Sequence, residues 1–180
     1  MTTTSPESGD EAEGDTGEPA ACLEWSMGVG AGPTLLWQHL EPGPSRFREL
    51  VVDPQGRAYV TSEGERQLIA FAVDGSERWV WVSDGDLGQG LARFEDRLIV
   101  GGTSSIDDGA HPDWLRIADF DGTVLDEHLD PEGKEAFWHV EVGPAGEILV
   151  GGRRQTSHPD LRVALYEADL SLRWVHIEGE

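Results

Sequence analysis

Short apolar runs alternate along most of the chain with clusters of glycine, proline and aspartate. The first clear set consists of residues 50–52, 58–60, 68–73 and a run that contains Trp79. Each run is rich in valine, isoleucine, leucine and aromatic residues, which favours β-strands. No long segment has the apolar spacing of an amphipathic helix. The pattern therefore predicts an all-β fold of short strands joined by turns.

The strand pattern recurs at a nearly constant spacing. One segment occurs in three versions, which are residues 71–79, 118–126 and 166–174. The turn in each version carries an aspartate, and these are Asp74, Asp121 and Asp169, at spacings of 47 and 48 residues. A second segment, residues 47–60, recurs 90 residues later as residues 137–150. A period of this size is typical of a repeat architecture, so residues at repeat positions are expected to serve the repeat first.

Each repeat contains four predicted strands, which is the content of one β-propeller blade. We place the units at about residues 37–79, 80–126 and 127–174 of a repeat region that spans residues 21–180. Residues 22–27 and 35–39 add two strands of a partial blade. The predicted fold is thus a propeller of four-stranded antiparallel blades, about three complete and one partial, in an incomplete or open ring. Propellers usually close with about four to eight blades, so we expect a fragment of a longer propeller, a subunit that completes its ring with another chain, or a truncated remnant.

The repeats also resemble a known family. The turn segment that ends at Trp79, together with the xPxG turn and the Ile-Leu-Val-Gly-Gly run of residues 148–152, is similar to the repeats of bacterial PQQ-like (quinoprotein-type) β-propeller proteins. The resemblance covers roughly residue 34 to the end of the sequence. It implies a propeller of the non-enzymatic, envelope or lipoprotein-like branch. The fuller signature of the quinoprotein enzymes places Thr-Gly before the tryptophan turn, and Asp74-Gly75-Ser76 departs from it.

The first twenty residues have a different composition. Residues 1–20 are acidic and rich in Thr, Ser, Gly and Pro, so we expect a disordered tail or linker. Cys22 is the only cysteine, which excludes an internal disulfide. A tether of this kind resembles the linker behind a lipid-anchored cysteine. The location is therefore open between the envelope or outside, if a signal peptide lies upstream, and the cytoplasm.

The charge of the chain narrows the classes of partner. The formal net charge is −22 at pH 7. Nucleic acid is excluded as a partner on this ground, because its phosphates would be repelled. No apolar run is long enough to cross a bilayer, so membrane insertion is not expected. Protein or glycan partners, and self-association through open blade edges, remain.

One face of the predicted ring carries acidic and imidazole residues in equivalent loops. The tripeptides His111-Pro112-Asp113 and His158-Pro159-Asp160 lie 47 residues apart, each before a predicted third strand. The candidate ligand-binding residues on this loop face are Asp107, Asp108, His111, Asp113, Arg153, Arg154, His158 and Asp160. The simpler interpretation is that proline directs the chain into the strand and aspartate caps the loop.

The remaining candidate functional residues are the tryptophans and three residues of the predicted first strands. Trp37, Trp79 and Trp174 share one repeat position and are predicted to pack between neighbouring blades. Trp81, Trp114 and Trp138 are off that position, and their default role is also packing. Glu49, Arg93 and His139 lie at roughly comparable places in first strands but suggest no catalytic set, and no cofactor or metal is expected. We therefore expect a non-catalytic scaffold that binds a protein or glycan through its loop face, with a quinoprotein-like enzyme or a non-functional remnant as alternatives.

Overall fold

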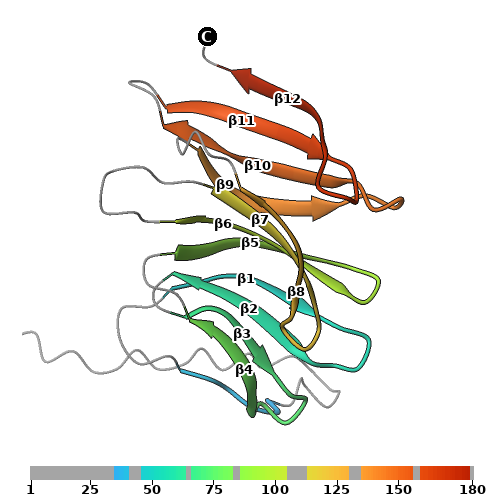
Figure 1. The fold of residues 1–180 in the computed structure, drawn as a ribbon. Coiled ribbons are helices and arrows are strands. Elements are labelled where there is room, and N and C mark those ends of the chain that lie inside the picture. The colour runs from blue at the N-terminus through green and yellow to red at the C-terminus, as the bar shows by residue number, and fades with distance from the viewer. Residues whose placement is uncertain are drawn as a thin grey trace, which may run out of the picture. The chain divides into compact units, whose positions relative to one another are not determined.

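The computed structural model describes residues 35–40, 46–63, 66–82, 86–104, 113–129, 135–155 and 159–178. Within these ranges the chain forms twelve β-strands and no helix (Figure 1). The strands are β1 (Arg46–Val52), β2 (Ala58–Glu63), β3 (Arg66–Phe71), β4 (Glu77–Val82), β5 (Asp86–Phe94), β6 (Arg97–Ser104), β7 (Asp113–Asp119), β8 (Val124–Leu129), β9 (Glu135–Val142), β10 (Ile148–Gln155), β11 (Pro159–Tyr166) and β12 (Leu172–Glu178).

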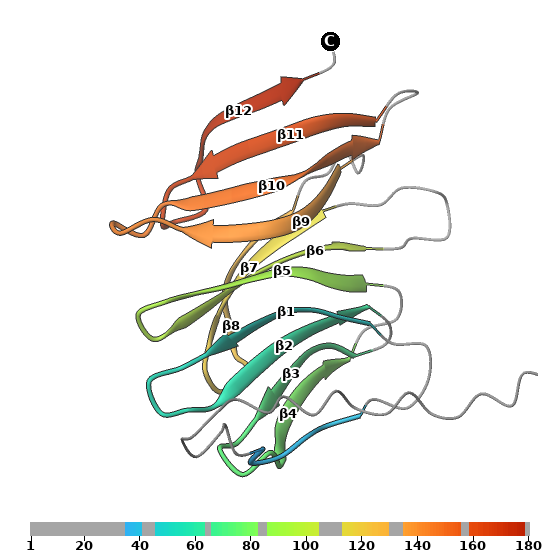
Figure 2. The same cartoon turned by 180° about the vertical axis from the view of Figure 1, so that it is seen from behind.

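The strands form three antiparallel sheets of four strands each. Consecutive strands pair within each sheet, in the orders β1-β2-β3-β4, β5-β6-β7-β8 and β9-β10-β11-β12 (Figures 1 and 2). We call these sheets the first, second and third blades. They belong to one compact unit of residues 36–180. The prediction of an all-β, propeller-like fold with an open ring is confirmed.

The turn between the third and fourth strands has the same geometry in every blade. In the first blade the Ala72 N–H donates to the carbonyl of Ser76 at 2.8 Å, and the Gly75 N–H donates back to the carbonyl of Ala72 at 2.9 Å. Gly75 and Gly122 hold φ angles of +82° and +87°, which glycine adopts without the steric cost that a Cβ brings. The third blade places Leu170 at the same point with a φ of +61°.

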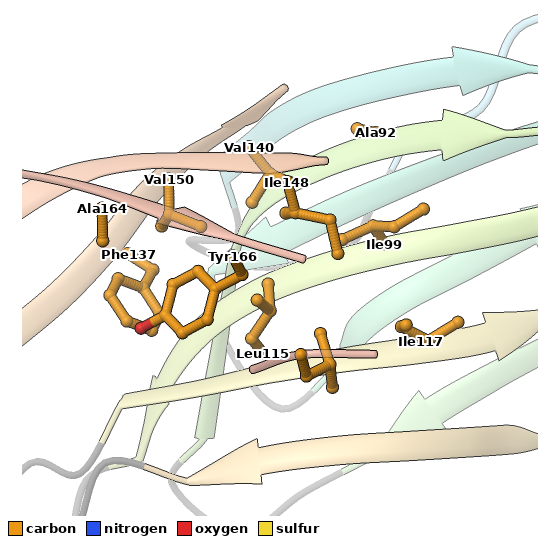
Figure 3. Close-up of a cluster of buried hydrophobic side chains, with 11 residues drawn as sticks. Ala92, Ile99, Leu115, Ile117, Phe137, Val140, Ile148, Val150, Ala164 and Tyr166 are labelled. Carbon is orange, nitrogen blue, oxygen red and sulfur yellow. The ribbon is translucent and has the colours of Figure 1, made fainter. Parts of the chain in front are cut away.

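Two apolar clusters join the blades. Tyr59, Leu68 and Ala70 of the first blade pack against a set in the second blade that comprises Leu91, Leu98, Val100, Trp114 and Ala118. The other face of the second blade packs against the third blade, and Figure 3 shows Leu115 and Ile117 facing the buried residues Phe137, Ile148, Val150 and Tyr166. Burial of apolar surface between the sheets, at about 25 cal/mol per Å², is the main force that holds the blades together. Trp114 is fully buried, as expected for a packing residue.

A tryptophan from one blade covers the glycine turn of the next. The Trp79 indole lies over Gly122, where an added Cβ would be 3.0 Å from the ring, and its Nε1–H donates to the carbonyl of Phe120 at 3.1 Å. Trp37 lies over Gly75 in the same way, with its Cγ only 2.6 Å from the place a Cβ would take. The predicted inter-blade role of Trp79 is confirmed. Residues 35–40 form no strand, so the predicted strand of a partial blade at residues 35–39 is wrong and Trp37 packs on the first blade from outside any sheet. Trp174, predicted to share this role, is 44% exposed.

The junction between the second and third blades lacks this pair. Asp126 pairs with Ile117 in the second blade at the place where Trp79 pairs with Ala70 in the first blade. The second blade therefore has an aspartate at the tryptophan position. The third-blade turn opposite carries Leu170, whose side chain is buried in the shared apolar cluster. Tryptophan and glycine are thus lost together at one junction, because the glycine is needed only where an indole lies on the turn.

A buried carboxylate fastens the first hairpin of the first blade. The Asp53 side chain accepts hydrogen bonds from the Gln55 and Arg57 N–H groups at 2.9 Å, from the Arg57 guanidinium, and from the Tyr59 hydroxyl at 3.1 Å. Burial alone would raise the pKa of Asp53, but these hydrogen bonds outweigh it and hold the pKa below its ordinary value of 3.8. Burial and the bond to Asp53 raise the pKa of Tyr59 to about 12.

Some predictions fall outside the described residues. These are the acidic tail of residues 1–20, the strand at residues 22–27 and the setting of Cys22. In the part of the chain that the structure describes, no helix has the length and apolar character needed to span a membrane.

Candidate functional site

The three inner strands β1, β5 and β9 lie next to one another and carry a β-bulge at the same place. The pairing of β1 with β2 shifts between Phe47 and Leu50, and that of β5 with β6 shifts between Gly88 and Gly90. The pairing of β9 with β10 shifts between Phe137 and His139. At these shifts Arg48 and Glu49 together oppose the single residue Thr61, while Gln89 and Trp138 are the unpaired residues of β5 and β9. A bulge re-aims the side chain it carries, and bulges are common beside functional sites.

The bulged residues meet around one hollow of about 370 Å³. Its walls are Arg48, Glu49, Gln89, Trp138 and His139, so every inner strand contributes to it. Arg48 and Gln89 lie near the start of β1 and β5, which is the end of the blades that carries the predicted loop face (Figure 1). The fold therefore gathers polar side chains from three blades at one point, although they are up to 91 residues apart in the sequence.

Glu49 joins all three blades at the floor of this site. One carboxylate oxygen accepts the Leu91 N–H of the second blade at 2.8 Å. The other oxygen lies 2.8 Å from Nδ1 of His139 in the third blade. The Glu49 N–H donates to the Thr61 hydroxyl, which in turn donates to the Gln89 carbonyl at 3.0 Å. These bonds fix the carboxylate, so the site is preorganised at its acidic end.

Gly90 makes the contact between Glu49 and His139 possible. Leu50 pairs with Val60, Leu91 with Val100 and Val140 with Val150, and these pairs occupy equivalent places in the three blades. The residues immediately before them, Glu49, Gly90 and His139, are therefore equivalent as well. A Cβ on Gly90 would lie 2.7 Å from a Val140 methyl and 2.9 Å from the Val140 nitrogen. Only glycine lets β9 approach β5 this closely. The middle blade thus offers no side chain between the acid and the imidazole.

Trp138 forms an aromatic wall of the hollow. Its side chain is 38% exposed, and the Arg153 guanidinium stacks over the ring at 5.1 Å from the centroid. Hydrogen-bonding side chains also line the hollow: the Glu49 side chain is 25% exposed and the His139 side chain is 75% exposed. The hollow thus combines an apolar ring with donors and acceptors. Among the described residues no cluster of three or more His, Cys, Asp or Glu is placed to hold a metal.

The predicted loop-face residues are only partly described. Asp107, Asp108, His111 and His158 lie outside the described residues. Arg154 and Asp160 pair in the backbone register of β10 and β11, and nothing more of them is described. Asp113 is fully buried at the start of β7, whereas Arg153 is exposed and lies beside the hollow through its contact with Trp138. The loop-face site remains a prediction, and Arg153 connects it to the inner-strand hollow.

Sequence reasoning placed Arg93 at the wrong position in the repeat. Arg93 pairs with Leu98 and corresponds to Val52 and Val142, while Gly90 corresponds to Glu49 and His139. Arg93 donates to the carbonyl of Glu95 at 3.1 Å and lines a neighbouring hollow with Glu49 and Glu141. The signal that identifies the pair is the 90-residue offset of the repeat, because equivalent residues of inner strands come close together. The bulges leave no such signal in the sequence.

Comparisons with known proteins support the fold without adding a function. No protein-family model and no curated protein matches the sequence. The chain is similar in structure to a protein of unknown function from Bacteroides caccae, with a TM-score of 0.51 and 12% identity over 78% of this chain. It spans 64% of that protein's length. A match to the C-terminal domain of Bacillus megaterium YpeB covers 77% of this chain and 92% of that one at 8% identity, but its TM-score of 0.21 is too low to indicate a shared fold. The PQQ-like resemblance stays a prediction.

Proposed function

We propose that this protein is a non-catalytic propeller-type scaffold that binds a glycan in the inner-strand hollow, at the loop-face end of the blades. The observation that carries the proposal is the coincidence of three bulges, which directs Arg48, Gln89 and Trp138 toward one hollow. A bulge interrupts the pairing between two strands, so strand pairing does not explain why three strands carry bulges at equivalent points. They are accounted for if the side chains they present have a ligand.

The composition of the hollow suits a sugar ring. One face of a pyranose carries C–H groups and packs on a flat indole, while its hydroxyls both donate and accept hydrogen bonds. Trp138 offers the indole, Arg48 donates, and Gln89 and Glu49 accept. Glu49 is held by Leu91, so its orientation need not be acquired on binding. A neutral hydroxylated ligand also avoids repulsion by the net charge of −22.

The test is a binding titration with neutral oligosaccharides, followed by tryptophan fluorescence and by calorimetry. Replacing one stacked aromatic side chain costs about 1–3 kcal/mol when its partner is a planar ring, and we use that range as a guide for the indole–sugar contact. Trp138→Ala should therefore weaken binding by about fivefold to 150-fold. Trp174→Ala is the matched control, because Trp174 is an exposed tryptophan of the same blade outside the hollow, and it should leave the affinity unchanged.

Equal losses in the two variants, or no binding across the oligosaccharide series, would reject the glycan. A peptide library screened with the same two variants then distinguishes a protein partner in the same hollow. Binding that survives Trp138→Ala would place the ligand elsewhere on the chain.

An enzyme is the second candidate, and the Glu49–His139 pair is the observation that favours it. A carboxylate 2.8 Å from an imidazole nitrogen can orient the ring, which is how general bases are positioned. His139 is exposed on its other side, where a substrate proton could be reached. Turnover of a chromogenic glycoside or ester series that is lost in both Glu49→Gln and His139→Gln would support this candidate over the scaffold.

A further inference from the structure

The third blade has an apolar face that no described residue of the chain covers. In the register of β10, β11 and β12, the residues Leu149, Leu161, Val163, Leu165 and Trp174 share this face, together with the polar residues Arg153, His176 and Glu178. Leu161 is 56% exposed, Trp174 44% and Leu149 39%. Exposed apolar side chains that gather on one sheet face mark an interaction surface rather than ordinary solvent contact.

This face is the counterpart of one that is buried between the first two blades. The strand pairings make Leu149, Val163 and Leu165 equivalent to Tyr59, Leu68 and Ala70. Those three first-blade residues are fully buried against the second blade. The third blade thus presents a blade-docking face to solvent.

Trp174 also lacks the turn that its position requires. It pairs with Leu165 as Trp79 pairs with Ala70, and Trp79 lies on the Gly122 turn of the following blade. Three described turns in this chain are of that kind. The Gly122 turn is taken by Trp79, the Leu170 turn has no room for an indole, and the Gly75 turn is taken by Trp37.

Trp37 holds the Gly75 turn from outside any blade. Residues 36–40 form no strand, and Leu36 and Leu40 are 81% and 80% exposed. Trp37 packs on the buried first-blade cluster of Ala58, Val60, Ile69 and Phe71, and the His39 ring lies 4.8 Å from the Phe71 ring, centroid to centroid. A whole blade can compete with a segment that forms no strand, because the blade adds a buried sheet face to the same indole contact.

We propose that the open face of the third blade docks onto the first blade of a second copy, and that Trp174 takes the place over Gly75 that Trp37 holds in the single chain. The acceptor face matches in position, because Ala58, Val60 and Phe71 are equivalent to Leu98, Val100 and Ala118, which receive the first blade inside the chain. These three first-blade residues are buried in the single chain, so docking has to displace what covers them. The contact is head to tail, so it must close into a ring or run on as a filament. Two copies of the three described blades give six, which lies within the four to eight blades of closed propellers.

Two opposing terms set the concentration at which the copies associate. Trp37 belongs to the same chain as Gly75, so it competes with an effective concentration of about a millimolar. The net charge of −22 on each copy adds repulsion, which salt screens within about 8 Å at physiological ionic strength. Removing Trp37 and raising the salt concentration should therefore each favour the two-copy ring.

Sedimentation velocity of the full chain tests the proposal. Trp37→Ala should lower the concentration at which a two-copy species forms by about tenfold or more, and 0.5 M NaCl should lower it further. Trp37→Ala combined with Trp174→Ala should remain a single copy at every concentration. Trp138→Ala in place of Trp174→Ala is the matched control, and it should leave association intact.

A folded Trp37→Ala variant that stays a single copy up to about 1 mM would overturn the proposal, and so would association that persists without Trp174. Species that keep growing beyond two copies would overturn ring closure. If Trp37→Ala does not fold, the unmodified chain and Trp174→Ala are compared over the same concentrations in 0.5 M NaCl, where only the former should associate. Glycan binding is not measured here, so failure of this proposal is distinct from failure of the proposed function.

Discussion

The Trp79 indole lies on the backbone of Gly122, with an added Cβ placed only 3.0 Å from the ring, and donates its N–H to the carbonyl of Phe120. One side chain thus fixes both the distance and the angle between the first and second blades. Its polar end is hydrogen-bonded while its apolar body is half-buried, which suits tryptophan better than any other residue. The first predictions test how much stability rests on this contact.

Gly122→Ala should destabilise the fold more than Gly56→Ala. Both glycines hold φ angles above +80°, so alanine pays the left-handed strain of about 1–2 kcal/mol at either site. At Gly56 the nearest atom to the new Cβ is a Val73 methyl at 3.6 Å, whereas at Gly122 the indole must move. We expect an additional loss of about 1–3 kcal/mol for Gly122→Ala, measured as the free energy of unfolding in urea. Equal losses at the two sites would show that the indole contact is not tight.

Leu170→Gly should destabilise the third blade although glycine suits its φ of +61°. The Leu170 side chain is 5% exposed and belongs to the cluster between the second and third blades. Losing a buried leucine costs about 2–5 kcal/mol, which exceeds the strain of about 1–2 kcal/mol that glycine relieves. Leu172→Ala, at a position that is 48% exposed, is the control and should change the free energy of unfolding by less than about 0.5 kcal/mol.

Asp53→Asn should remove part of the acid sensitivity of the fold. The pKa of Asp53 is lowered in the folded state, so its contribution is present above the unfolded value of 3.8 and is lost as pH falls through the folded value. The variant should be less stable near pH 7 by about 1–3 kcal/mol and should lose less stability between pH 5 and pH 3. Asp96→Asn, at a side chain that is 85% exposed, should leave that acid profile unchanged.

Tyr59→Phe should change how the stability of the fold depends on pH in the alkaline range. The pKa of Tyr59 is raised to about 12 from 10.0, so the folded state holds its proton longer than the unfolded chain. The stabilisation is therefore complete below pH 10 and is lost as pH rises from 10 to about 12. The midpoint temperature of thermal unfolding, measured over that pH range, should fall less steeply in Tyr59→Phe than in the unmodified protein. An identical slope would mean that the hydroxyl is not protected by the fold.

Glu49→Ala should cost more stability than His139→Ala. Glu49 satisfies the half-buried Leu91 N–H, and leaving such a group without its acceptor costs about 1–3 kcal/mol. His139 is 75% exposed, so its removal frees a carboxylate oxygen that water can solvate, and the loss should stay below about 0.5 kcal/mol. Chemical denaturation of the two variants measures this difference. A larger loss for His139→Ala would mean that the imidazole, not the backbone bond, holds the inner strands together.

The strands were predictable because their causes are local. The apolar run at residues 148–150 and the Asp74-Gly75 turn specify a strand and a hairpin whatever lies beyond them. The shared position of Trp37, Trp79 and Trp174 was visible for the same reason, because residues at one repeat position are expected to make equivalent contacts. The hollow was not predictable in this way. A bulge at Gln89 or Trp138 depends on the register of the neighbouring strand, and no residue type marks it.

The sequence by itself determined that this protein is built of repeated four-stranded blades, because period-two apolar strands and glycine turns are read from neighbouring residues. Only the tertiary structure decided which side chains meet. Glu49 reaches His139 because Gly90 lets one inner strand pass close to another, and Trp174 stays exposed because no described turn is left to receive it. Both results depend on how separate sheets pack, and that packing is a property of the whole fold rather than of any segment.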